Sequence, residues 1–224
     1  MRRTKSLTRR GIVRFPPPQV CDFGLARLYG GSSPARPYTP TVVTLWYRAP
    51  ELLLGAKRYG PPIDTWSMGC IMAELLQGRP LFRGEGEVEQ LNKLVDMLGT
   101  PTARDWPTRG KEGEPGYAPG YLDMPSIKGG ARLKQNPTAR LREKFPKHSF
   151  HGGPTLSDAG FDLLRSLLAW DPAARPTAAE ALRHEWFREA PLPKDAGLMP
   201  TFPARHEKNR DEEVVTANKH MGST

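Results

Sequence analysis

Apolar residues recur with helical spacing in several stretches of the chain. From Asp64 to Gly78 they occupy almost every side of the helical wheel, which predicts a buried helix that ends at Gly78 and Pro80. A second amphipathic helix, closed by Gly99 as its C-cap, is predicted from the apolar positions Val88, Leu91, Leu94, Val95 and Leu98.

Two further helices are predicted by capping signals. Ser157 can cap a helix that presents Phe161, Leu164, Leu167 and Leu168. Thr177 and Glu180 form a capping box, which should open a last short helix through Trp186. Strand signals are scarce, and the β-branched run Thr41–Trp46 lies among prolines, so we expect an extended loop there. The fold class is therefore mainly α, with long loops.

The chain divides into three parts. Residues 1–19 form a basic, proline-rich tail, residues 20–190 carry the predicted domain, and residues 191–224 turn polar and form a C-terminal tail. Within the domain, residues 100–155 are rich in Gly, Pro, Lys and Arg and show no clear period. We expect this stretch to be an insertion or a functional loop.

Composition supports one domain. The chain has 224 residues, of which 38% are hydrophobic and 25% charged, so a packed core is expected. Neither an apolar run of spanning length nor a secretory signal is found, and no membrane partner is expected. The only cysteines are Cys21 and Cys70, which favours a reducing compartment, the nucleus or the cytoplasm.

The net charge of +9 is concentrated in the N-terminal tail. Six basic residues precede the first acid, Asp22. Such a tail could bind RNA, a membrane surface or an import receptor, or act as an organelle transit peptide. No aromatic residue interleaves the basic ones, so no stacking platform exists and we expect no specific nucleic-acid partner.

Several motifs follow one another in a fixed order. Asp22–Gly24 reads D-F-G and Ala49–Glu51 reads A-P-E, and this pair resembles the two ends of the activation segment of protein kinases. The later strings Asp64–Cys70 and Trp170–Pro176 resemble landmarks of the kinase C-terminal lobe. Over about residues 20–205 the sequence resembles the cyclin-dependent Ser/Thr kinases, through the stretches Asp22–Arg27, Val42–Glu51 and Leu98–Pro101. Within that family it is most similar to the PITSLRE branch, through Tyr38–Pro40, Leu52–Lys57 and Trp186–Pro193.

The resemblance implies roles in binding Mg-ATP and in regulation by phosphorylation. Asp22 corresponds to the aspartate that holds Mg²⁺ on ATP, and Phe23 and Gly24 complete its motif. Thr39 corresponds to the activating phosphothreonine, and Arg27 to one of the arginines that receive its phosphate.

The resemblance also implies substrate-binding and supporting residues. Val42 and Val43 would shape the pocket for a proline after the phosphoacceptor, and Thr44 would lie near the catalytic aspartate. As structural supports, Glu51 and Arg175 would form a buried ion pair, and Asp64 would brace the catalytic loop. Protein substrates and a cyclin-like regulatory subunit are the implied partners.

Parts of the kinase pattern have no counterpart before Asp22. Neither H-R-D-x-x-x-x-N, nor a Gly-rich phosphate loop, nor a V-A-I-K lysine occurs there. We therefore expect a C-terminal lobe without an N-terminal lobe, no catalytic activity of the isolated chain, doubtful binding of ATP and Mg²⁺, and an exposed apolar patch on the uncovered surface.

Two alternatives remain open. The chain could be a non-catalytic binding module that competes for kinase substrates or regulatory subunits. It could also be a truncated or misassembled reading of a longer gene, with residues 1–19 as non-kinase sequence.

Overall fold

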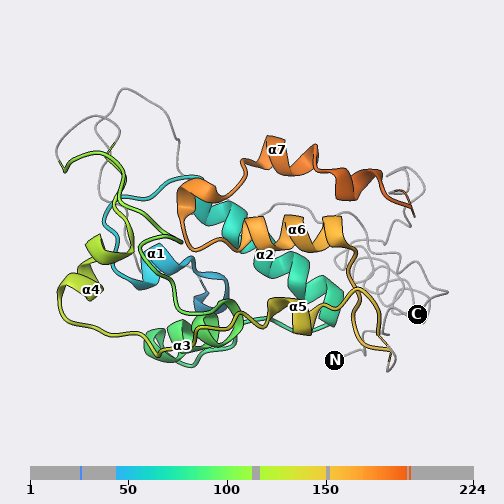
Figure 1. Cartoon of the computed structure of the whole chain (residues 1–224), viewed down its shortest axis with the longest axis horizontal. Coiled ribbons are helices and arrows are strands. Elements are labelled where there is room, and N and C mark those ends of the chain that lie inside the picture. The colour runs from blue at the N-terminus through green and yellow to red at the C-terminus, as the bar shows by residue number, and fades with distance from the viewer. Residues whose placement is uncertain (1–25, 27–43, 113–116, 150–151, 191, 193–224) are drawn as a thin grey trace, which may run out of the picture. The chain divides into compact units, whose positions relative to one another are not determined.

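The computed structural model describes residue 26 and residues 44–112, 117–149, 152–190 and 192. This part of the chain is helical and contains no β-strand, only one isolated antiparallel bridge between Arg109 and Ala118. None of its helices is both long and apolar enough to cross a membrane. The mainly α fold class is confirmed for the described residues (Figure 1).

Three helices are the longest elements of the described residues. They are α2 (Pro62–Gln77), α3 (Glu87–Leu98) and α6 (Asp158–Leu167). Helix α6 packs along α2, and Gly69 of α2 permits the close approach, because a Cβ there would lie only 2.9 Å from side-chain atoms of Leu167 and Leu168. Figure 1 shows this pairing of α2 and α6.

The predicted helix ends are confirmed. Gly78 closes α2 with φ 75°, a left-handed conformation that glycine adopts without strain. Gly99 is the C-cap of α3. The Ser157 hydroxyl accepts a hydrogen bond from the Gly160 N–H at the start of α6.

The last predicted helix is wrong in its extent. The Thr177 capping box does open α7 (Ala178–Leu182), but that helix ends four residues before Trp186. His184 then caps a separate 3₁₀ turn, η5 (Glu185–Arg188), because its Nδ1 accepts the Trp186 N–H. A local side-chain bond thus interrupts what the pattern predicted as one helix.

The remaining elements are short. The segment before α2 contains η2 (Leu45–Tyr47), which includes the last two residues of the run expected to be extended, and α1 (Pro50–Leu53). The insertion is more ordered than its lack of period suggested, with η3 (Tyr121–Asp123), α4 (Pro125–Lys128) and α5 (Leu141–Lys144), and η4 (Pro172–Ala174) follows α6.

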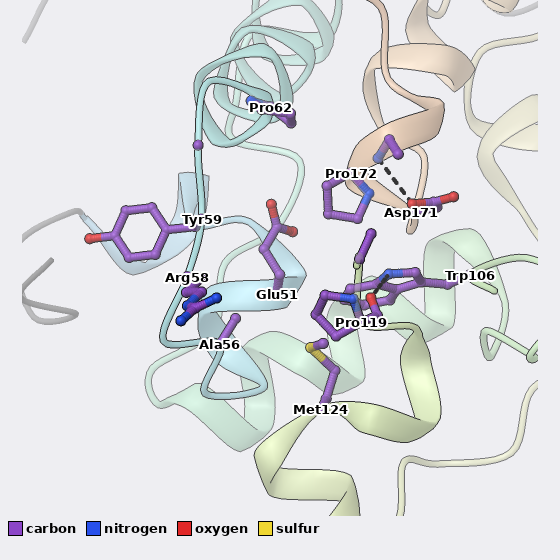
Figure 2. Close-up of a pocket in the computed structure, with 13 residues that line it drawn as sticks. Glu51, Ala56, Arg58, Tyr59, Pro62, Trp106, Pro119, Met124, Asp171 and Pro172 are labelled. Atoms are coloured by element: carbon purple, nitrogen blue, oxygen red, sulfur yellow. Dashed lines mark hydrogen bonds between the residues drawn. The ribbon is translucent and has the colours of Figure 1, made fainter. Parts of the chain in front are cut away.

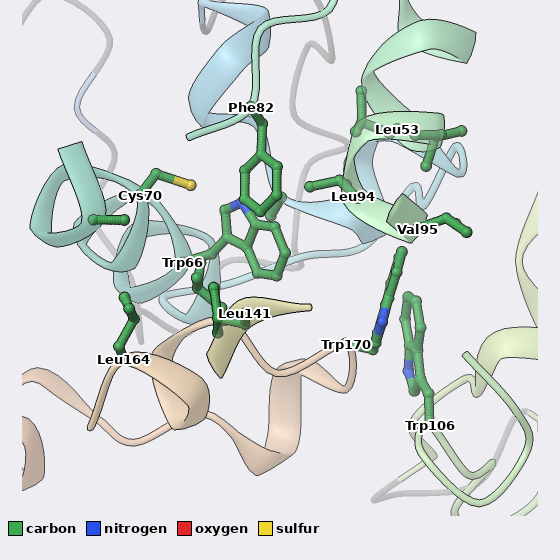
Figure 3. Close-up of a cluster of buried hydrophobic side chains, with 14 of the residues drawn as sticks. Leu53, Trp66, Cys70, Phe82, Leu94, Val95, Trp106, Leu141, Leu164 and Trp170 are labelled. Carbon is green, nitrogen blue, oxygen red and sulfur yellow. The ribbon is translucent and has the colours of Figure 1, made fainter. Parts of the chain in front are cut away.

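The core gathers around Trp66 of α2. Trp66 is fully buried and its ring stacks on Phe82, with 6.1 Å between ring centroids (Figure 3). Trp170 and Cys70 are buried as expected, whereas Trp186 is only partly buried. Burial raises the pKa of the Cys70 thiol, so it behaves as a small apolar side chain. Val88 was assigned to the core face of α3, but it is 74% exposed.

Candidate functional site

Four of the predicted site residues lie in the described part of the chain. They are Thr44, Glu51, Asp64 and Arg175. The others lie outside the described residues, namely Asp22, Phe23, Gly24, Arg27, Thr39, Val42 and Val43. The described geometry therefore concerns residues 44–51, the end of the stretch that resembles an activation segment (the activation-segment string), and its attachment to the helices.

Glu51 and Arg175 form a buried bidentate ion pair. Glu51 belongs to α1, whose first turn begins with Pro50, and Arg175 follows η4. Arg175 Nη1 donates to Glu51 Oε1 at 2.8 Å and Nη2 donates to Oε2 at 2.8 Å. The two side chains are 0% and 5% exposed. The pairing inferred from the resemblance is thus present, across 124 positions of sequence.

The Arg175 guanidinium uses all five of its N–H groups. Besides the two bonds to Glu51, it donates to the carbonyl oxygens of Pro62, Ala169 and Trp170 at 2.9, 2.8 and 3.2 Å. Its carbon lies 5.0 Å from the centroid of the Trp66 ring, in cation–π contact. One side chain therefore joins α1, the start of α2 and the segment after α6.

The residues just before Ala49 are tied to helices α2 and α3. The Tyr47 hydroxyl donates to Glu74 of α2 at 2.6 Å, and Arg48 pairs with Glu87 of α3 at 2.7 Å. The Trp46 indole donates to the Gly84 carbonyl at 3.0 Å. Sequence reasoning assigned no role to these partners, because it used residues 45–48 only to support the resemblance.

The Tyr47–Glu74 bond changes the titration of the phenol. Desolvation first, and then the hydrogen bond and the negative charge of Glu74, raise the pKa of Tyr47 to about 12. The phenol stays neutral at physiological pH and donates its proton to the carboxylate. The backbone that follows Thr44 is thus fixed by a side-chain bond to α2.

Asp64 differs from Glu51 in its surroundings. Its side chain is exposed in the first turn of α2, and no described residue gives it a hydrogen bond or an ion pair. Partial desolvation raises its pKa. The carboxylate is therefore an acceptor without a donor in the described part of the chain.

An apolar stripe continues from Asp64 along the same face of α2. Met68, Ile71 and Leu75 are 53%, 36% and 55% exposed and follow Asp64 at helical spacing. The prediction of a buried helix from Asp64 to Gly78 is therefore correct for one face of α2 and wrong for this one. Thr44 is also exposed.

A magnesium site needs oxygen ligands that converge. Among residues 26, 44–112, 117–149, 152–190 and 192, no cluster of His, Cys, Asp or Glu side chains could hold a metal ion. Glu51 is fully engaged by Arg175, and Asp64 stands alone. The described residues do not fit Mg²⁺, and Asp22 lies outside them.

A helical domain in which the A-P-E glutamate forms a buried ion pair with a distant arginine is the arrangement that the kinase resemblance implied. The protein kinase domain model matches residues 14–187, and the chain belongs to the protein kinase family. The match begins earlier than the motif resemblance, which begins at about residue 20.

The chain's relatives include cyclin-dependent kinases, which confirms the expected cyclin-dependent kinase type. Cyclin-dependent kinase G-2 of Oryza sativa subsp. japonica is 55% identical over 192 residues, covering 86% of this chain and 25% of the relative. Cyclin-dependent kinase 11B of Homo sapiens is 46% identical over 204 residues, covering 91% and 22%. The chain thus spans about a quarter of the length of these relatives.

A solved structure shares the fold. The crystal structure of the yeast RNA Pol II CTD kinase CTDK-1 complex superposes with a TM-score of 0.62 at 35% sequence identity. The match covers 80% of this chain and 52% of that chain.

Proposed function

We propose that the chain supplies the substrate-binding lobe of a cyclin-dependent Ser/Thr kinase that phosphorylates Ser or Thr before proline. The observation that carries this proposal is the Glu51–Arg175 pair with its five hydrogen bonds, because it holds the end of the activation-segment string on the lobe. Activity, substrates and partners follow from the relatives and belong to the proposal.

The proposed roles lie mostly before Thr44. Asp22, in its motif with Phe23 and Gly24, would hold Mg²⁺ on ATP, and the ion would neutralise charge on the transferred phosphoryl group when bound. Thr39 would be the phosphorylated switch, with Arg27 as one of its partners. Val42 and Val43 would accept the proline of the substrate beside Thr44. Asp64 would accept hydrogen bonds from the catalytic loop and brace it.

The partner class follows from the relatives' names. A cyclin-like regulatory subunit is proposed because the matched relatives are cyclin-dependent kinases. A nuclear place of action is proposed because the solved neighbour is named as a kinase of the RNA Pol II CTD.

We further propose that these 224 residues by themselves transfer no phosphate and correspond to a C-terminal lobe. Two observations support this. No H-R-D motif and no V-A-I-K lysine precede Asp22 in the printed sequence. In the described part of the chain, Asp64 lacks a donor and the neighbouring stripe of α2 lies exposed. Positioning and charge stabilisation, on which phosphoryl transfer depends, would then be incomplete.

A chimera tests the kinase proposal. The region of rice cyclin-dependent kinase G-2 that precedes its D-F-G motif is fused to residues 22–224 and assayed with Mg-ATP, a Ser-Pro peptide and an added cyclin. We expect phosphorylation that disappears with Asp22→Asn and persists with Asp105→Asn, a control on an exposed acid. No transfer by the folded, cyclin-bound chimera would contradict the proposal. Transfer by the 224-residue chain alone would contradict its inactivity.

The second candidate is a non-catalytic binding module. The exposed stripe of α2 favours it, since exposed apolar surface marks interaction sites. In a mixture with an active relative, excess chain would then inhibit phosphorylation by competing for its substrate or regulatory subunit. Equal rates with and without the chain would exclude this candidate.

A further inference from the structure

A small, mainly apolar cavity lies beside Glu51. Its volume is about 140 Å³, and it is lined by residues of α1, the α1–α2 loop, the insertion and η4. Figure 2 shows Arg58 and Tyr59 on one side of it and Trp106 and Asp171 on the other. Its apolar walls are three proline rings, an indole and a thioether, from Pro62, Pro119, Pro172, Trp106 and Met124.

The walls are held firmly. Trp106 is 2% exposed, and its indole donates to the Pro119 carbonyl at 3.1 Å. Met124 is 1% exposed. Arg109 and Ala118 exchange two backbone hydrogen bonds of 2.9 Å, which closes the part of the insertion that faces the cavity. The cavity is thus a preformed feature of the described structure.

The acids that line the cavity are already bonded. Both carboxylate oxygens of Glu51 accept hydrogen bonds from Arg175. The two oxygens of Asp171 accept hydrogen bonds from Arg109 Nη2 at 2.5 Å and from the Ala173 N–H at 2.9 Å. Neither acid is left to attract a cation.

The basic residues of the α1–α2 loop, unlike these acids, have no charged partner among the described residues. Lys57 and Arg58 are exposed, Arg58 lines the cavity, and neither has an acidic partner among the described residues. Arg109 adds a third positive group, 43% exposed, beside Asp171. Arg109 is neutralised by Asp171, so the positive charge without an acidic partner beside the cavity comes from Lys57 and Arg58.

Size limits what can enter. Sites for drug-sized ligands usually enclose about 300–1,000 Å³. A cavity of about 140 Å³ is too small for such a ligand but suits one apolar side chain of a larger partner. A buried apolar anchor with charged neighbours at the rim is the usual arrangement of a protein–protein hot spot.

We propose that this cavity, lined by Trp106, Met124 and Ala173 with Arg58 at its rim, docks an extended segment of a protein partner. The segment carries one bulky apolar side chain that enters the cavity, next to acidic residues that pair with Lys57 and Arg58. This docking site goes beyond the proposed kinase function, and it is tested by binding alone, so the loss of one proposal leaves the other standing.

The test starts from an unbiased probe. A phage library of random dodecapeptides is selected on the immobilised 224-residue chain, and enriched peptides are labelled and titrated by fluorescence anisotropy. We expect enriched peptides to share a bulky apolar residue beside Asp or Glu. A selection that enriches no such pattern overturns the proposal.

Variants then locate the bound peptide. Ala173→Trp places an indole over the cavity from an exposed position, and we expect about tenfold weaker binding because the apolar anchor is excluded. Its matched control is Ala174→Trp, at the next exposed residue, which does not line the cavity and should leave affinity unchanged. Arg58→Glu should weaken binding about fivefold through charge reversal, and more at low salt than at high salt. Arg188→Glu is its control.

Circular dichroism confirms that each variant is folded before titration. Equal affinity of the parent chain and Ala173→Trp would overturn the docking site. So would the finding that vesicles of phosphatidylcholine and phosphatidylserine, or an oligouridine RNA, bind the chain in an Ala173→Trp-sensitive way while the acidic peptides do not.

Discussion

Both faces of α2 are apolar, but one is buried and the other is exposed. On one face, Trp66, Gly69, Cys70 and Ala73 are all buried, against α6, Phe82 and the Arg175 guanidinium. On the other face, Met68, Ile71 and Leu75 are exposed. Figure 3 shows the packed side around Trp66 and Cys70.

The difference shows that apolar character alone does not decide which face of a helix becomes core. Residues of the packed face have specific partners. Gly69 leaves room for Leu167 and Leu168 of the α6 segment, and the Trp66 ring contacts the Arg175 guanidinium. On the other face, Met68, Ile71 and Leu75 stay 53%, 36% and 55% exposed. Substitutions on the two faces should therefore have opposite consequences for stability and association.

The largest expected effect comes from breaking the ion pair beneath the packed face. Arg175→Met leaves the Glu51 carboxylate buried without a counter-charge, and we expect a loss of about 3–5 kcal/mol in the free energy of unfolding. The measurement is urea unfolding followed by tryptophan fluorescence. The control is Lys134→Met at the exposed Lys134–Asp96 pair, whose side chains are 55% and 46% exposed. That change should cost at most about 1 kcal/mol.

The double variant Glu51→Leu/Arg175→Met sharpens the interpretation. Because it removes both charges, it should recover part of the stability that Arg175→Met loses. Equal destabilisation by Arg175→Met and Lys134→Met would show that the buried pair does not hold the segment to the lobe.

The next effect concerns the contact of α2 with α6. Gly69→Ala places a Cβ 2.9 Å from Leu167 Cβ and Leu168 Cδ2, so the helices must separate. Overpacking of this kind costs about 1–3 kcal/mol, more than the gain in helix propensity of about 1 kcal/mol. Met68→Ala, one residue earlier on the open face, should stay within about 0.5 kcal/mol. Stabilisation by Gly69→Ala in thermal unfolding would contradict the close packing.

The third prediction concerns the hydrogen bond from Tyr47 to Glu74 of α2, whose contribution to stability should depend on pH. Tyr47 has its pKa raised to about 12, so the contribution of its neutral hydroxyl is fully present below pH 10 and is lost as pH approaches about 12. Tyr47→Phe should lower the free energy of unfolding by about 1 kcal/mol at neutral pH. The difference between the two proteins should shrink above pH 10, which urea titrations at several pH values would detect. A constant difference would exclude the Glu74 bond as its origin.

Local patterns predicted α2, α3 and α6 and their caps because their determinants lie within a few residues. The Glu51–Arg175 pair came only from the resemblance, since no local signal joins positions 124 apart. The bonds of Arg175 to the Pro62 carbonyl and of Tyr47 to Glu74 were missed for the same reason. The end of α7 before His184 was not predicted, because the hydrogen bond from the Trp186 N–H to the His184 side chain starts a separate 3₁₀ turn there.

The smallest effect on stability is expected on the open face, where the effect on association should be clear. Met68→Gln/Leu75→Gln replaces two side chains that are 53% and 55% exposed, so the free energy of unfolding should change by less than about 0.5 kcal/mol per site. Binding of an anilinonaphthalene dye and concentration-dependent sedimentation should both decrease, because a contiguous apolar stripe is removed. The control is Val88→Gln, a single apolar residue on α3 that is 74% exposed. If the double variant and the control behave alike, the stripe is not a distinct association surface, and the two faces of α2 differ in exposure without differing in function.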